Sequence, residues 1–262
     1  MTAILAQDLV KVFHTRKGEV RAVDGISFAV EPGEIYGLLG PNGAGKTTTL
    51  RILATLLTPT SGRAQVLGHD VVAAPQEVRA RIGFQATETG LYERLTPWET
   101  LLFFARIFGL SREEAEARAM ATLELLDLVE LKDRKVGTLS TGERQKLSLG
   151  RCLIHNPPVL ILDEPTFGLD VFVAKTVSDL ILRLKGEGHT ILLSTHNMHL
   201  AARLCDRVGI IWRGKLWAQG TPEGLSSRVG DVDFEEVFFR TLAGAGLSAA
   251  GANPVPWADG SG

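Results

Sequence analysis

Three glycines, a lysine and a threonine stand at a fixed spacing in the stretch "GPNGAGKT", Gly40 to Thr47. The stretch matches the pattern G-x-x-x-x-G-K-[ST] and lies between an apolar strand-like run, "EIYGLL", and a helical run. Glycine lets the backbone wrap so that successive amide N–H groups point at phosphate oxygens. Lys46 would add a point charge at the β- and γ-phosphates, and the Thr47 hydroxyl would reach Mg²⁺. A glycine-rich turn with a stray lysine would not need this strand–loop–helix context, so the pattern predicts a phosphate-binding loop.

Two adjacent carboxylates end a second apolar run, "VLILDEP", Val159 to Pro165. Acidic residues pack poorly in a buried strand but are useful at the open end of a parallel sheet. We expect Asp163 to hold Mg²⁺, directly or through water, and Glu164 to polarise the attacking water. Alone, such acids often just cap the next helix. Together with the phosphate loop they indicate a hydrolytic site.

A third stretch, "LSTGERQ", Leu139 to Gln145, has the pattern of a helix start. Ser140 can act as N-cap, and Glu143 can reach back to complete a capping box. Gly142 costs backbone entropy in a first turn, and close approach of another group would explain it. A helix N-terminus with serine and glycine suits an anion. A capping box alone accounts for Ser140 and Glu143 and leaves Gly142 unexplained.

The runs that position these residues alternate between strand-like and helical. Strand-like runs come first and resume at "VLILD", "TILLST" and "RVGIIWRGKLWAQG", with helical runs between them. The intervening segment is mostly helical, with Pro97 opening one helix and Ser111 capping another. This order predicts an α/β core interrupted by a helical insertion at about 88–156. A short helical run, "DFEEVFFRTLAG", follows, and the Gly-, Ala-, Pro- and Ser-rich residues 244–262 are expected to be disordered.

Composition excludes several classes of protein. The 262 residues carry a formal net charge of -2, so no bulk basic field indicates nucleic acid as a partner. The two cysteines do not form a disulfide framework in a chain of this length. The sequence shows no signal-peptide pattern, and no apolar run approaches the ~18 residues of a membrane span.

The motifs "GPNGAGKT", "LSTGERQ" and "LILDEPTFGLD", in this order, closely resemble those of the nucleotide-binding subunit of ABC transporters. The resemblance covers about Ala3 to Leu225. It implies a P-loop NTPase fold, a RecA-like α/β core with an antiparallel β-subdomain and a helical subdomain insertion. The implied organisation is an ATPase domain at 1–225, a helical extension at 226–243 and the tail at 244–262.

The resemblance also assigns roles to single residues. It implies ATP and Mg²⁺ as cofactors, with Thr47 and Asp163 at the metal and Lys46, Glu164 and His196 in catalysis. His196, in "LLSTHNM", stands at the switch histidine, Asp170 at the D-loop, and Phe13 at the aromatic that stacks on adenine. ATP binding is assigned to the following residues: Phe13, Gly40, Pro41, Asn42, Gly43, Ala44, Gly45, Lys46, Thr47, Thr48, Ser140, Gly142 and Asp170.

In the family two subunits pair head-to-tail, and "LSTGE" is the signature motif. Ser140 and Gly142 would therefore face the ATP held by the phosphate loop of the opposite subunit. This chain departs from the family at the glutamine loop, "RIGFQATETGLYERLTPWETL". Thr87 holds the glutamine position and Gln85 lies two residues earlier, so either Gln85 serves through a shifted backbone or the loop lacks a direct metal ligand.

The implied partners are an integral-membrane permease and a second ATP-binding subunit, a homodimer being expected, at the cytoplasmic face of the membrane. "TETGLYERLTPWETL" and "FEEVFFRTLAG" are similar to ABC-2-type exporters, especially the sodium-exporter (NatA-like) group. Drug, polysaccharide and lipid exporters are alternatives, and a non-transport ABC ATPase would need coiled-coil heptads that the sequence lacks. We expect Tyr92 and Trp98 to lie near the groove that receives the permease.

Overall fold

The computed structural model describes residues 2–16, 18–87, 90–228, 230 and 234–244. Most of the tail expected to be disordered, from residue 245 onward, therefore lies outside the described residues. Within the described ranges, none of the helices has the length and apolar character needed to cross a bilayer.

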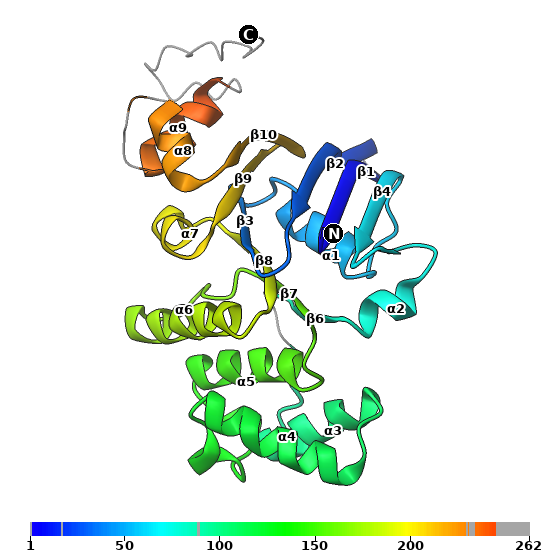
Figure 1. The fold of residues 1–262 in the computed structure, drawn as a ribbon, viewed down its shortest axis with the longest axis vertical. Helices are drawn as coiled ribbons and strands as arrows, with labels where there is room; N and C mark the ends of the chain where they lie inside the picture. The colour runs from blue at the N-terminus through cyan, green and yellow to red at the C-terminus, as the bar shows by residue number, and fades with distance from the viewer. Residues whose placement is uncertain (1, 17, 88–89, 229, 231–233, 245–262) are drawn as a thin grey trace.

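A six-stranded sheet forms the centre of the molecule, in the order β10-β9-β3-β8-β7-β6 (Figure 1). Its strands are β3 (Ile35–Leu39), β6 (Ile82–Gln85), β7 (Val159–Asp163), β8 (Thr190–Thr195), β9 (Arg207–Trp212) and β10 (Lys215–Gly220). All neighbours pair in parallel except β9 and β10. Strands β3, β7 and β8 are buried along their whole length, as apolar runs covered on both faces require.

The strand register brings the predicted chemistry to one edge of this sheet. Leu39, the last residue of β3, pairs with Thr195, the last residue of β8. Asp163, the last residue of β7, pairs with Ser194. The phosphate loop, the carboxylates and the histidine loop thus leave three adjacent strands at their carboxyl ends, where open α/β sheets place their ligands.

A second, antiparallel sheet has the order β2-β1-β4-β5. It consists of β1 (Ile4–Thr15), β2 (Gly18–Val30), β4 (Ser61–Val66) and β5 (His69–Asp70). Helix α1 (Lys46–Leu53) lies between the two sheets (Figure 1), and its Leu50, Ile52 and Leu53 share one buried cluster with apolar residues of both. This shared core fixes the phosphate loop, which precedes α1, between the sheets.

Three helices gather below the six-stranded sheet in Figure 1, α3 (Pro97–Ile107), α4 (Arg112–Leu125) and α5 (Thr141–Leu153). Each begins with a capping box, at Thr96, Ser111 and Ser140 respectively. The remaining helices are α2 (Pro75–Arg79), α6 (Val171–Gly186), α7 (Met198–Leu204), α8 (Pro222–Arg228) and α9 (Phe234–Gly244), with 3₁₀ turns at Val129–Leu131 and Val136–Thr138. An α/β core with an antiparallel sheet and a helical insertion is the predicted fold class, and it is confirmed.

Candidate active site

The phosphate loop needs glycine at two of its positions for steric reasons. A Cβ on Gly40 would lie 2.3 Å from the carbonyl oxygen of Ile211. A Cβ on Gly45 would lie 2.4 Å from the carbonyl oxygen of Ala22, and Gly45 has a φ of 110°. Gly45 is also the N-cap of α1, where no side chain caps the helix in the part of the chain that the structure describes. The first N–H groups of α1 are therefore available to a phosphate.

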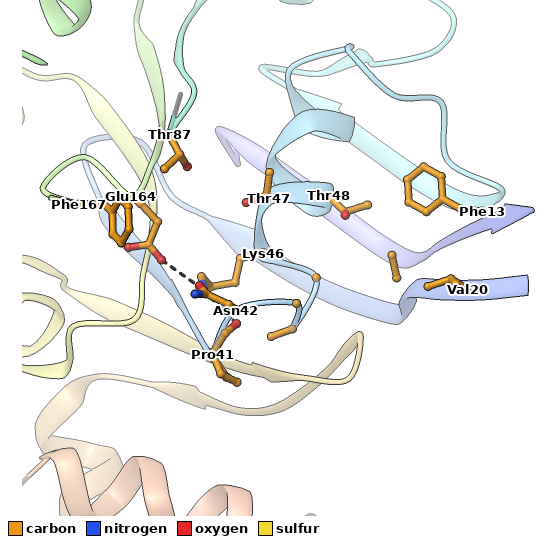
Figure 2. A pocket seen from close by; sticks show the side chains of 14 residues that line it. Phe13, Val20, Pro41, Asn42, Lys46, Thr47, Thr48, Thr87, Glu164 and Phe167 are labelled. Atoms are coloured by element: carbon orange, nitrogen blue, oxygen red, sulfur yellow. Dashed lines mark hydrogen bonds and ion pairs between the residues drawn. The ribbon is translucent and has the colours of Figure 1, made fainter. Parts of the chain in front are cut away.

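Lys46 lies over this loop with only 5% of its surface exposed. Its Nζ donates to the carbonyl oxygens of Gly40, at 2.6 Å, and Pro41, at 3.3 Å. The same Nζ lies 3.3 Å from Oε1 of Glu164, the ion pair drawn as a dashed line in Figure 2. A buried ammonium so held can exchange one of these oxygens for a phosphate oxygen without being desolvated again.

Asp163 is buried, and one of its two carboxylate oxygens has hydrogen-bond partners. Its Oδ1 accepts from the hydroxyl of Thr47, at 3.0 Å, and from that of Ser194, at 2.6 Å. Its Oδ2 is buried and has no partner among the described residues. A hydroxyl and a carboxylate with a free oxygen are hard donors of the kind that Mg²⁺ takes alongside phosphate oxygens. With two protein donors, this set fits a metal whose other ligands are nucleotide phosphate oxygens and water.

Glu164 faces both Lys46 and His196. Its Oε2 lies 3.0 Å from Nδ1 of His196, and its backbone N donates to the Ser194 hydroxyl at 3.0 Å. The Glu164 backbone has a φ of 50°, a left-handed conformation that costs free energy in a residue with a side chain and persists where neighbours enforce it. The ring of Phe167 meets His196 edge-on, with centroids 5.9 Å apart. The carboxylate is thus aimed into the site from a constrained turn.

A cavity of about 530 Å³ connects these groups to the β-subdomain. Glu164, Thr87 and Phe167 stand at one side of it, and Phe13 and Val20 stand at the other side (Figure 2). Phe13 and Val20 are partners in the β1–β2 register, and Ala22 also lines the cavity. An apolar end and a charged end, with the phosphate loop between them, match a nucleotide lying with its base on Phe13 and its phosphates at Lys46.

The structure distinguishes the two candidates for the glutamine-loop position. Thr87 lines the cavity, and its hydroxyl donates to the carbonyl oxygen of Asp163 at 3.4 Å. Gln85 is 1% exposed at the end of β6 and is not among the lining residues. The loop therefore presents a hydroxyl to the site.

Four residues assigned to ATP binding do not line this cavity, namely Gly40, Ser140, Gly142 and Asp170. Ser140 is exposed and caps α5, and its backbone N donates to the Glu143 carboxylate at 2.7 Å. Asp170 caps α6, accepting from the backbone N of Phe172 and Val173 at 2.9 and 3.0 Å. Gly142 packs on α6 of its own chain, since a Cβ there would lie 2.8 Å from Cγ1 of Val173. This contact explains Gly142 without a phosphate, an explanation that the sequence did not offer.

Sequence reasoning missed Ser194 and Phe167. Ser194 bridges both carboxylate residues, and a serine in the apolar run "TILLST" was the available signal. Phe167 stands in "DEPTFGLD", but nothing in the sequence indicates its contact with His196. Trp98 packs against the main core cluster.

The matches to known proteins agree with this geometry. The family model described as "ABC transporter" matches residues 23–167. The chain belongs to the ABC transporter ATP-binding family. It is 40% identical to the ABC transporter ATP-binding protein NatA of Bacillus subtilis, over 91% of this chain and 98% of that protein. It is 41% identical to the daunorubicin/doxorubicin resistance ATP-binding protein DrrA of Streptomyces peucetius, over 87% of this chain and 68% of that protein.

Solved ABC cassettes share the fold. An ATP-binding subunit of an ABC transporter superposes with a TM-score of 0.82 at 29% identity, covering 92% of this chain and all of the other. A dimeric bacterial ABC transporter cassette superposes with a TM-score of 0.77 at 26% identity, covering 83% and 98%. The predicted P-loop NTPase fold and the prediction of an ATP-binding ABC ATPase are confirmed.

Proposed function

We propose that two copies of this ABC ATPase pair head-to-tail around two ATP molecules and drive a separate membrane permease that exports its cargo. The observation that carries the proposal is the position of α5, the helix that begins with the signature motif and is called the signature helix below. The phosphate loop and Glu164 line the cavity, whereas Ser140, at the start of α5, is exposed and outside it. A second chain would supply the missing side of the site.

An exposed apolar surface beside the site supports pairing. Phe167, Val171 and Phe172 are 56%, 82% and 85% exposed, and they flank Asp170. Large apolar side chains this exposed and this close together are typical of a surface that is buried on association. The dimeric state of a similar solved cassette agrees with this use.

Mg²⁺ would be held by Thr47 and Asp163 together with the nucleotide phosphates. When bound, the metal would neutralise charge developing on the phosphoryl group. Within the chain, Lys46 orients the phosphates, Glu164 takes the proton of the attacking water, and His196 holds the Glu164 carboxylate through its 3.0 Å contact.

The permease has a candidate docking groove between the sheet and the helical insertion, of about 170 Å³. Apolar side chains line it, with Arg79 and Arg151 at its polar positions. Of these, Leu56 is 56% and Phe108 is 37% exposed, which suits an amphipathic helix of a partner. We also propose Tyr92 and Trp98 as contacts of the permease. Tyr92 is 56% exposed and meets Phe103, and Trp98 is partly buried against the core cluster.

For the cargo we propose Na⁺ or another ABC-2-type substrate, on the likeness to NatA. The likeness to the drug-resistance protein DrrA, and to the Nod factor export ATP-binding protein I of Burkholderia orbicola (41% identical over 85% of this chain and 73% of that protein), favours export of a drug, polysaccharide or lipid as the second candidate. We further propose residues 1–225 as the ATPase domain, 226–243 as a helical extension and the cytoplasmic membrane face as the place of work.

Size-exclusion chromatography with light scattering tests the pairing. Glu164→Gln protein should elute as a dimer with ATP and as a monomer with ADP, because slowed hydrolysis preserves the bridging γ-phosphate. Lys46→Ala protein, which lacks the phosphate contact, should stay monomeric with both nucleotides. A monomer under all conditions would refute the shared site.

A further inference from the structure

The first turns of α5 contact the loop that carries Glu164, and the helix α6 that follows this loop, in the same chain. Gln145 Nε2 donates to the carbonyl oxygen of Pro165 at 2.8 Å, and Pro165 directly follows Glu164. Three residues earlier, on the same face of α5, Gly142 packs on Val173. Residues 164–173 are therefore held against the signature helix at both ends.

Glu164 is the first residue of a turn at the first of these contacts. The backbone N of Phe167 donates to the carbonyl oxygen of Glu164 at 3.0 Å, which closes a turn with Pro165 and Thr166 at its centre. This closing bond does not use the Pro165 carbonyl, so Gln145 is free to take that acceptor. Because Glu164 has a left-handed backbone, the turn depends on such outside contacts to keep its shape.

We propose that Gln145 is a positioning residue for Glu164 of its own chain. The inference rests on the proposed function, in which Glu164 is the base and α5 faces the partner's ATP. The start of α5 would then act in two directions. Ser140 would face the nucleotide of the partner, and Gln145, half-buried one and a half turns further on, restrains the turn that aims the chain's own Glu164. Binding of the partner's ATP to α5 would therefore affect the position of Glu164 in the chain that carries this α5.

A different role for Gln145 is to shape the helix N-terminus for the partner's ATP only. The two roles predict different defects when Gln145 is replaced. Loss of positioning slows the chemical step and leaves nucleotide binding and ATP-dependent pairing intact. Loss of the docking surface weakens the pairing itself.

Gln145→Met tests the positioning role, because it keeps the side-chain length and removes the donor. Losing one hydrogen bond that holds the turn should lower kcat about tenfold, with an unchanged nucleotide dissociation constant and melting temperature. Lys146→Met is the matched control, one residue further along α5, where the side chain lines a separate cleft beside Thr176 and Asp179. Lys146→Met should keep the kcat of the original protein. An unchanged kcat in Gln145→Met would overturn the proposal.

A second measurement separates positioning from docking. In a Glu164→Gln background the chemistry is already lost, so adding Gln145→Met should leave ATP-dependent dimerisation unchanged. If the double variant no longer dimerises, Gln145 serves the partner's site and the proposal is wrong. If Glu164→Gln alone fails to dimerise, the proposed shared site fails instead, and the kcat comparison still decides the role of Gln145.

Discussion

Two helix N-termini in this chain are built in opposite ways. Helix α1 starts at Gly45 with no side-chain cap, inside the cavity and beside the buried Lys46. Helix α5 starts at Ser140 with a complete capping box, exposed and outside the cavity. An uncapped start leaves N–H groups for a ligand, whereas a capped start is stable by itself. We propose that the first binds phosphate within its own chain and that the second binds the nucleotide of a partner chain.

We expect the largest effect from a variant that loses the general base and keeps both helix N-termini unchanged. Glu164→Gln should lower the hydrolysis rate by roughly 10²- to 10⁴-fold, the usual loss when a general base is removed. ATP affinity should stay close to that of the original protein, because Glu164 meets the phosphate loop through its ion pair with Lys46. Phosphate-release assays and titration with a fluorescent nucleotide measure the two quantities. Near-normal turnover would remove Glu164 from the catalytic role.

Ser140→Asp tests the α5 N-terminus alone. Aspartate keeps the N-cap, so the fold should be retained, but it places a negative charge where a γ-phosphate would dock. Such like-charge contact costs about 2–4 kcal/mol, so hydrolysis should fall on the order of a hundredfold while ATP binding by the monomer is unchanged. Ser140→Asn caps equally well without the charge and is the matched control. Equal turnover of the two variants would mean that no phosphate approaches α5.

Phe13→Ala tests the far end of the α1 site. Stacking of a base on an aromatic ring is worth about 1–3 kcal/mol, so ATP affinity should fall about tenfold, with kcat at saturating ATP unchanged. The adjacent His14→Ala, whose side chain is 77% exposed, is the control and should bind ATP normally. Equal affinities of the two variants would place the base elsewhere.

The smallest effect lies away from both N-termini. His155 stacks on Phe108, with ring centroids 3.6 Å apart, and burial lowers its pKa from 6.5 to about 4. The unfolded chain therefore binds this proton first, so the stability that the neutral ring contributes is present above pH 6.5 and is lost as the pH falls toward 4. After allowance for its partial exposure, the loss is on the order of 1 kcal/mol. The melting temperature of His155→Gln should fall less between pH 6.5 and pH 4 than that of the original protein. Parallel plots of melting temperature against pH for the two proteins would contradict this.

The sequence was informative where chemistry depends on neighbours along the chain. The phosphate loop, the capping boxes and the strand-end carboxylates are local patterns. The apolar runs beside them are long enough to predict the strands and helices that carry them. Contacts between elements that are distant in the sequence could not be predicted from it. Examples are Ser194 with Asp163, 31 residues apart, and Val173 with Gly142. The choice between Gln85 and Thr87 was of this kind, because it depends on where β6 ends and the chain turns toward Asp163.

Mixed dimers test the central claim, that α1 of one chain and α5 of the other share one ATP. Both chains carry Glu164→Gln, which preserves the bridging γ-phosphate. In this background Lys46→Ala damages the first half of a site, and Ser140→Asp damages the second half. In a mixed dimer one site carries both defects, and the other joins an intact Lys46 to an intact Ser140. We predict that mixing the two folded variants restores ATP-dependent dimerisation, measured by light scattering, that neither variant shows alone. If the mixture stays monomeric with ATP, the two N-termini do not share a nucleotide and the account is wrong.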